Sequence, residues 1–215
     1  MWLIAIVPLV LYFFYIPGAV LLSLLKIRDK DNSRYILSAV LGLSLFLIIT
    51  YLFSYARIIN LSLLLFSSFA AWYIFHKQWK QDISNIAVRN NLALILIISL
   101  GTLLFISLNI TSGVVTESGY HLRGTNARDG VLHLALSKTM SHTFPPQRPG
   151  LASVPLQGYH YFYPFLIAKI NDLLGIPVED LLFRIFPTII AISYGCAFFL
   201  LSTHLTPNRS TQNLI

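Results

Sequence analysis

The hydrophobic pattern of the chain consists mainly of long, uninterrupted apolar runs. A helix needs roughly 20 apolar residues to cross about 30 Å of hydrocarbon, because each residue adds about 1.5 Å. Five runs reach or approach that length, and they occupy residues 1–25, 35–54, 58–75, 92–110 and 181–203. Helices satisfy every backbone donor and acceptor in lipid without leaving an edge, so we predict five transmembrane helices. Pro17 and Pro187 are expected to kink the first and the last of them.

The composition favours the same class of protein. The chain has 215 residues, of which 56% are hydrophobic and 11% charged, and its mean hydropathy is +0.71. A soluble domain carries about 25% charged residues, so the soluble globular class is excluded. Abundant Leu, Ile and Phe with one cysteine also exclude a disordered chain and a disulfide scaffold.

The basic residues are distributed unevenly among the loops. The net charge is +7, and no basic stripe is interleaved with stacking aromatic residues, so we expect a lipid bilayer as partner and no nucleic acid. The loops after the first and third runs are the richer ones, with Lys26, Arg28, Lys30, Arg34, Lys77, Lys80 and Arg89, whereas the loop after the second holds only Arg57. Cytoplasmic loops carry the excess of Lys and Arg. The pattern therefore predicts a multi-pass protein of the cell membrane with its N-terminus outside and its C-terminus in the cytoplasm. No basic residue precedes the first run, which favours a retained anchor over a cleaved signal peptide.

These boundaries predict an all-α, polytopic transmembrane protein in three parts. Residues 1–90 form a three-helix transmembrane region, and residues 205–215 a cytoplasmic tail. Residues 91–204 hold two further transmembrane helices joined by a long, partly helical extracytoplasmic loop, 111–180. That loop contains most of the acidic residues and four of the six histidines. Long loops of this kind are often functional, so candidate chemistry is sought there.

Two helices are expected inside the outer loop. Residues 127–140 predict the first, with Asn126 as its N-cap and Asp129 in its first turn, where the helix dipole favours a carboxylate. Asp129 and His133 are four residues apart and would share one helix face. The following sequence, T-F-P-P-Q-R-P-G, must turn the chain. Residues 159–175 begin with aromatic side chains and predict a helix lying near the membrane surface, with a sixth, tilted span as the alternative.

The order of these features resembles the opening of the GT-C superfamily of polyprenyl-phosphate-sugar-dependent membrane glycosyltransferases, which includes mannosyl- and arabinosyltransferase-like enzymes. The resemblance covers residues 91–204. It is carried by Asp129, Pro145-Pro146, Tyr161-Phe162-Tyr163 and the segment G-I-P-V-E-D-L-L-F-R from Gly175 to Arg184. Gly130 stands where the family often has Glu, which weighs against a two-carboxylate role. Family members continue through many more helices, so the resemblance implies an N-terminal portion, truncated or split, with a separate chain carrying the missing helices as a partner.

The resemblance implies transfer of a sugar from a polyprenyl-phosphate carrier to an acceptor at the extracytoplasmic face. Asp129 would be the catalytic base, and His133 would hold or polarise it. Three cations are candidates for stabilising the leaving lipid phosphate, and three tyrosines for stacking on a sugar ring or prenyl chain. The cations are Arg128, Lys138 and Arg184, and the tyrosines are Tyr159, Tyr161 and Tyr163.

Each of these candidates also has a structural interpretation. Asp129 suits a helix N-terminus, Arg184 suits a snorkelling anchor, and tyrosines are common at the membrane interface. We expect no cofactor. A divalent metal has no support in the histidine spacing, which matches neither H-E-x-x-H nor a paired Cys/His site.

Two other functions stay open at this point. The first is a non-catalytic membrane protein fragment, or a helical module that binds a lipid or a partner helix. The second is a small transporter. It is less favoured because an ion pathway needs ionisable residues at mid-depth, and the five runs hold almost none.

Overall fold

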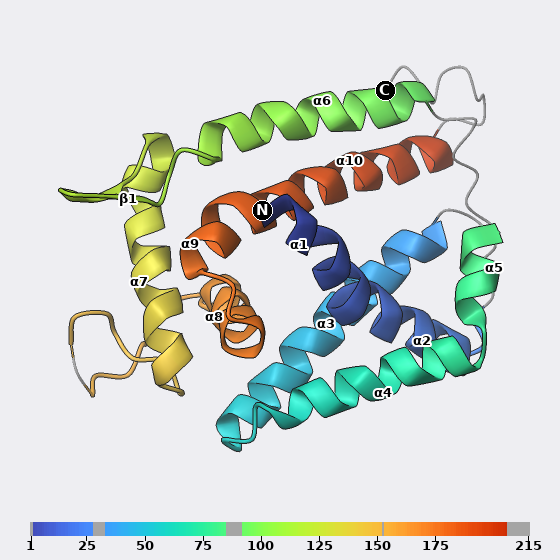
Figure 1. The fold of residues 1–215 in the computed structure, drawn as a ribbon, viewed down its shortest axis with the longest axis horizontal. Coiled ribbons are helices and arrows are strands. Elements are labelled where there is room, and N and C mark those ends of the chain that lie inside the picture. The colour runs from blue at the N-terminus through green and yellow to red at the C-terminus, as the bar shows by residue number, and fades with distance from the viewer. Residues whose placement is uncertain (1, 28–32, 85–91, 152, 206–215) are drawn as a thin grey trace.

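The computed structural model describes residues 2–27, 33–84, 92–151 and 153–205 (Figure 1). The N-terminal part contains α1 (Trp2–Leu9), the π-helical segment η1 (Val10–Tyr15), α2 (Ile16–Leu24), α3 (Ser33–Tyr55), α4 (Leu61–Phe75) and α5 (Gln78–Ser84). After α6 (Leu92–Asn109) come strands β1 (Val114–Thr116) and β2 (Gly119–His121), the 3₁₀ turn η3 (Gly124–Ala127) and α7 (Asp129–His142). The described chain ends with α8 (Phe162–Leu174), α9 (Val178–Asp180), the π-helical segment η4 (Leu181–Ile185) and α10 (Phe186–Leu205).

Three helical stretches of the described chain are long and apolar enough to cross a membrane. They are Ile4–Leu24, Arg34–Tyr55 and Val178–Phe198, while Leu61–Phe75 and Ile95–Asn109 are apolar but shorter. The prediction of a mostly helical protein is confirmed, and these three helices are compatible with the predicted membrane spans. The sequence predicts five spans, whereas three helices of the described chain meet the length and composition of a span.

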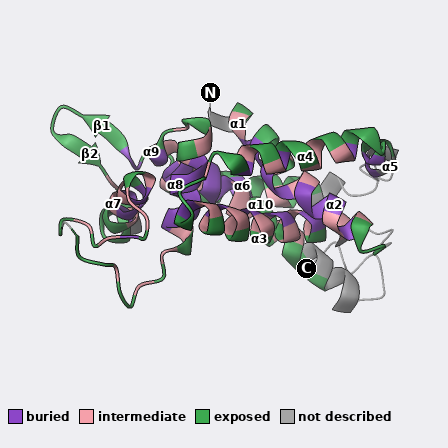
Figure 2. Cartoon of the chain, turned by 90° about the horizontal axis from the view of Figure 1, so that it is seen from below, coloured by how far each residue is buried: buried purple, intermediate pink, exposed green. Residues whose placement is uncertain are grey.

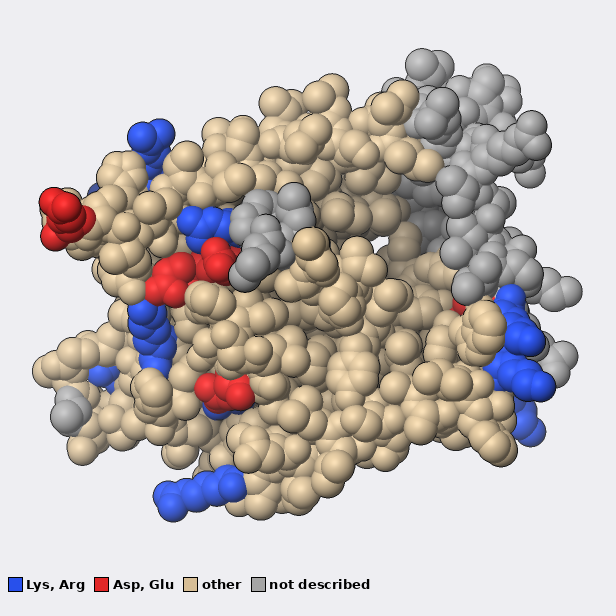
Figure 3. Space-filling model, viewed as in Figure 1, with Lys and Arg blue, Asp and Glu red and all other residues tan. Residues whose placement is uncertain are grey.

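The long helices run between two ends of the molecule (Figure 1). One end carries α5, and the other carries the β1–β2 hairpin and α7. Most of the charged side chains in view lie near these two ends, separated by a broad zone without Lys, Arg, Asp or Glu (Figure 3). This separation is what a bundle with its apolar middle in lipid requires, because charged groups near a bilayer centre are costly.

Each proline expected to kink a helix is preceded by a π-helical segment. η1 ends two residues before Pro17, and η4 ends two residues before Pro187. Proline has no backbone N–H, and its ring clashes with the carbonyl four residues earlier. A widened turn relieves that clash and keeps the helix continuous.

The bundle is held together by aromatic packing and by close backbone contact. The rings of Phe13, Phe46 and Phe66 are fully buried and lie 5.3–5.5 Å apart between centroids. A Cβ atom on Gly42 would lie only 1.5 Å from the carbonyl oxygen of Phe14. The backbones of η1 and α3 therefore touch at a glycine, a contact that small residues permit between membrane helices.

Helix α8 is largely covered by other parts of the protein, and its predicted position near the membrane surface stays a prediction. Its side chains from Pro164 to Ile170 are buried, and they enter two core clusters of this chain (Figure 2). Ile167 and Ile170 join the aromatic core of the bundle, whereas Phe165 packs with Leu136 and Met140 of α7. With 13 residues, about 20 Å, α8 is also too short for a sixth span.

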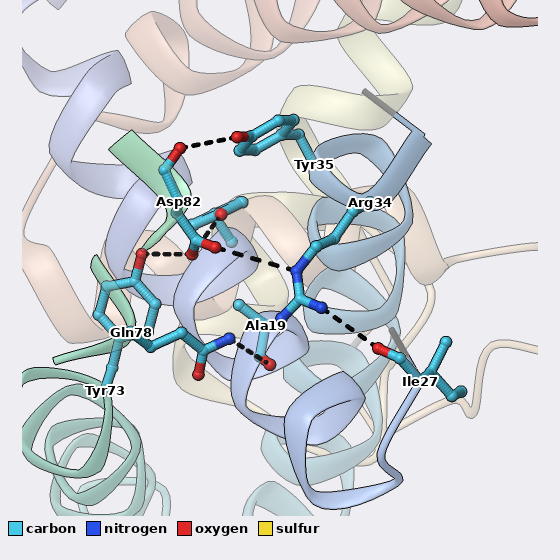
Figure 4. Close-up of polar contacts among 8 residues, drawn as sticks. Ala19, Ile27, Arg34, Tyr35, Tyr73, Gln78 and Asp82 are labelled. Atoms are coloured by element: carbon cyan, nitrogen blue, oxygen red, sulfur yellow. Dashed lines mark hydrogen bonds and ion pairs between the residues drawn. The ribbon is translucent and has the colours of Figure 1, made fainter. Parts of the chain in front are cut away.

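Helix α5, which the sequence did not predict, is fixed to the bundle by the buried carboxylate of Asp82 (Figure 4). The hydroxyls of Tyr15 and Tyr73 both donate to Asp82 Oδ2, each over 2.7 Å. The hydroxyl of Tyr35 donates to the backbone carbonyl of Asp82 over 2.7 Å. Arg34 Nε lies 3.9 Å from Asp82 Oδ1. One carboxylate thus joins α5 to η1, α3 and α4.

Candidate functional site

The candidate catalytic residue Asp129 lies in the first turn of α7, as predicted, and its side chain is exposed. The helix begins at Asp129, two residues later than the predicted start at residue 127. This position places the carboxylate at the positive end of the helix dipole. The predicted N-cap is wrong. Asn126 lies in η3, and its amide nitrogen donates to Asn109 Oδ1 over 3.0 Å and to Ser112 Oγ over 3.2 Å. Asn126 therefore ties the approach to α7 to the end of α6.

A cleft of about 240 Å³ lies between α6, α7 and the η4–α10 helix. From α7 it is lined by Gly130 and His133, and Asp129 and Arg128 are not among its lining residues. A Cβ on Gly130 would lie 3.1 Å from the ring of Phe183, so glycine allows α7 to approach η4 closely. The apolar lining residues are Phe105, Tyr163, Leu182, Phe183, Pro187 and Ile190, and the polar ones are Asn109, Asn126 and His133. The cleft is amphiphilic, because apolar side chains line one part of it and the side chains of Asn109, Asn126 and His133 line the other.

His133 lies in the cleft close to two aromatic residues, one before α8 and one in its first turn. Its ring centroid lies 5.9 Å from that of Tyr163 and 6.4 Å from that of Tyr159. Burial lowers the pKa of His133 below its usual 6.5, Asp129 acts in the opposite direction, and His160 lowers it further. Its Nδ1 is buried and has no hydrogen-bond partner in the described part of the chain. At neutral pH this histidine is a neutral imidazole with one ring nitrogen still to be satisfied.

The structure places Arg184 in an internal network away from open solvent. Its Nη1 donates to Asp180 Oδ1 over 2.8 Å, one helical turn earlier, and its Nη2 donates to the Ser112 carbonyl over 3.2 Å. The side chain is 11% exposed. Arg184 therefore connects the α9–η4 helix to the base of the β1–β2 hairpin.

Lys138 is also engaged, by residues that the sequence did not single out. Its Nζ lies 2.6 Å from Glu179 Oε1 and 2.5 Å from the hydroxyl of Tyr120. Burial alone would lower the pKa of Lys138, but the hydrogen bonds to Glu179 and Tyr120 outweigh it and raise that pKa. Glu179 lies 41 positions from Lys138, so no local pattern predicts this pair. The only sequence signal is that the loop is rich in acidic residues. Arg128, the third candidate cation, is exposed and directly precedes Asp129.

The three candidate tyrosines occupy different surroundings. Tyr163 lines the cleft, and its hydroxyl donates to the Leu182 carbonyl over 3.4 Å. Burial raises the pKa of Tyr163, so it stays a neutral phenol. Tyr161 lies away from the cleft, with its hydroxyl 3.4 Å from that of Tyr51, and burial followed by this contact raises its pKa to about 12. Tyr159 is half-buried and faces His133.

Among residues 2–205 outside the gaps, no three His, Cys, Asp or Glu side chains converge to hold a metal ion. Comparisons with family models, with curated proteins and with solved structures give no match for this chain. The fold and the cleft alone define its class. It is a mostly helical protein with three helices long and apolar enough to span a membrane, and with an amphiphilic cleft.

Proposed function

We propose that the chain is a membrane glycosyltransferase of the GT-C type, or the N-terminal portion of one. It would transfer a sugar from a polyprenyl-phosphate carrier to an acceptor hydroxyl at the extracytoplasmic face. The observation that carries this proposal is the amphiphilic cleft lined by Gly130 and His133 of α7, the helix whose exposed first residue is Asp129. Such a cleft matches a substrate with a prenyl chain on one side and a polar sugar phosphate on the other.

The proposed topology has five spans, with the N-terminus outside and the C-terminus in the cytoplasm. The two shorter apolar helices, Leu61–Phe75 and Ile95–Asn109, complete the three longer ones. The arrangement in Figure 1 supports it, because the α3–α4 turn lies at the end that carries α7, opposite α5. Lys77 and Lys80 would then face the cytoplasm, as the excess of basic residues predicts.

In this mechanism the acceptor oxygen attacks the anomeric carbon and forms the new glycosidic bond. The carbon–oxygen bond to the carrier phosphate breaks, and its electron pair leaves with the phosphate. The proton of the acceptor hydroxyl passes to the carboxylate of Asp129. Neutral His133, four residues further along α7, would orient that carboxylate or the acceptor.

The structure narrows the roles that we propose for the other candidates. Arg128 is the cation best placed to stabilise the leaving phosphate, because Lys138 and Arg184 already pair with carboxylates. Those two would position α7 and the hairpin. Tyr163 and Tyr159 remain candidates for contact with the sugar or the prenyl chain, whereas Tyr161 would support the fold.

The decisive experiment is a sugar-transfer assay with prenyl-phosphate-linked sugars and the full chain in membranes. Replacing a catalytic base typically reduces the rate by about 10²–10⁴-fold, so Asp129→Asn should lose activity on that scale. Glu117→Gln, on the exposed β1–β2 turn, is the matched control and should retain activity. Full activity of Asp129→Asn would eliminate Asp129 as base. A wild-type chain that binds the donor without transfer would instead support the non-catalytic lipid-binding module.

A further inference from the structure

A second pocket, of about 520 Å³, lies at the opposite end of α7 from Asp129. It is formed by the end of α3, the α3–α4 turn, the last turn of α7, the segment after it and α8. Its polar lining residues include Ser54, Arg57, His142, Gln147, Lys169 and Asp172. His133 and His142 are nine positions apart along α7, about 13 Å, so this pocket is separate from the cleft.

The charges of the second pocket are unbalanced. Lys169 is buried, with 5% of its side chain exposed, and its Nζ lies 2.5 Å from Asp172 Oδ2. This pair is formally neutral. Arg57 is exposed, and none of the ion pairs in the described part of the chain includes it. The pocket therefore keeps one formal positive charge on a guanidinium, the group that best matches a phosphate.

The neutral polar groups of the second pocket complement a ligand with hydroxyls. The hydroxyl of Ser141 donates to Asn171 Oδ1 or to the Ser137 carbonyl, and the hydroxyl of Thr143 donates to the Thr139 carbonyl. Both oxygens keep lone pairs that can accept a hydrogen bond. The amide oxygen of Gln147 accepts from the Ser153 backbone N–H over 3.2 Å, which leaves its NH₂ group as a donor. Acceptors beside a guanidinium and an amide donor fit a phosphate ester that carries hydroxyl groups.

We propose that this second pocket binds a hydroxylated phosphate ester, with Arg57 paired to the phosphate. Two sources share this chemistry, a lipid headgroup such as phosphatidylglycerol and a free ester such as glycerol 3-phosphate. The flanking residues Tyr55 and Ile58 are 68% and 42% exposed, so Arg57 lies at the edge of the apolar zone, where headgroups would be. The proposal does not depend on catalysis by Asp129.

The test uses the full chain in phosphatidylcholine nanodiscs, with thermal unfolding as the readout, because a ligand that binds only the folded state raises the midpoint. Glycerol 3-phosphate is added in one arm, and phosphatidylglycerol is mixed into the nanodisc in the other. Glycerol and sulfate at matched ionic strength are the controls. Stabilisation in the first arm identifies a free ester, and stabilisation only in the second identifies a lipid headgroup. No stabilisation in either arm overturns the proposal.

Variants assign the binding to this pocket. Arg57→Gln should weaken affinity by about tenfold or more, because a charge-assisted hydrogen bond is lost. Arg148→Gln removes a second exposed arginine of the same outer region that does not line the pocket, and it should bind as the wild type does. If both substitutions weakened the affinity equally, binding would depend on the general surface charge, and the proposed site would be refuted.

A second variant tests the pocket independently, in case Arg57→Gln impairs folding. Gln147→Glu keeps the acceptor for the Ser153 N–H and adds a negative charge to the pocket. It should weaken binding as Arg57→Gln does, with an unchanged midpoint in the absence of ligand. Unchanged affinity of Gln147→Glu would contradict the proposed position of the phosphate.

Discussion

The carboxylate of Asp82 allows a quantitative prediction about what holds α5 to the bundle. Asp82 is 6% exposed and accepts hydrogen bonds from two phenols. A hydrogen bond to a charged group contributes about 1.5–3 kcal/mol, and a neutral one about 0.5–1.5 kcal/mol. Asp82→Asn keeps the shape but turns both charge-assisted bonds into neutral ones, so we expect a loss of about 2 kcal/mol in the free energy of unfolding. The Arg34 contact, at 3.9 Å, adds little to this loss.

The measurement is reversible unfolding of the purified chain in mixed detergent micelles. Tyr15→Phe and Tyr73→Phe should each cost about 1.5–3 kcal/mol, because each removes one bond to the carboxylate. The matched control is Tyr12→Phe in the same N-terminal helix, whose hydroxyl bonds to Ser67 Oγ in an exposed, neutral pair and whose loss should cost about 1 kcal/mol or less. Equal losses for Tyr12→Phe and Tyr15→Phe, or an Asp82→Asn variant as stable as the wild type, would refute the reasoning.

Two further predictions concern packing and pH. Gly42→Ala should destabilise the chain by about 1–3 kcal/mol, because the new Cβ meets the Phe14 carbonyl, whereas Gly101→Ala on α6 meets nothing within 4 Å and should be neutral or slightly stabilising. Similar unfolding free energies for both glycine variants would contradict the close crossing. The pKa of His133 is lower in the folded state than in the unfolded state, so protonation favours unfolding and stability should fall as pH drops below about 6.5. His133→Gln should flatten that part of the stability–pH curve, and a slope identical to the wild type would exclude His133 as its source.

The elements that the sequence predicted well are those defined by local pattern. The run 35–54 became α3, Ser33–Tyr55, because a continuous apolar run satisfies its own backbone bonds. Asp129 begins α7, and α8 ends at Gly175, whose φ of 66° suits glycine. Each of these boundaries depends on residues within one or two turns.

The elements that the sequence missed depend on contacts between distant positions. Helix α5 has seven residues and no apolar stripe, and its position depends on Tyr15, which lies 67 residues from Asp82. The β1–β2 hairpin had a weak local signal, the β-branched run Val114–Thr116 followed by a turn that ends at Gly119. The partners of Arg184 and Lys138 lie on elements whose packing no single sequence window defines.

The pairing of charges in the outer region changes what the candidate site can do. The sequence offered three cations for one leaving phosphate, but Lys138 and Arg184 are paired with Glu179 and Asp180 and hold the hairpin, α7 and α9 together. Arg184 is largely buried, so the loss of its carboxylate partner is strongly disfavoured. Lys138 is exposed, and a move to a ligand would break its contacts with Glu179 and Tyr120. Asp129 and Arg128 thus remain as an adjacent, exposed carboxylate and guanidinium at the start of α7, outside the lining of the cleft. Their formal charges cancel, so the two side chains together add no net charge that would balance a donor phosphate.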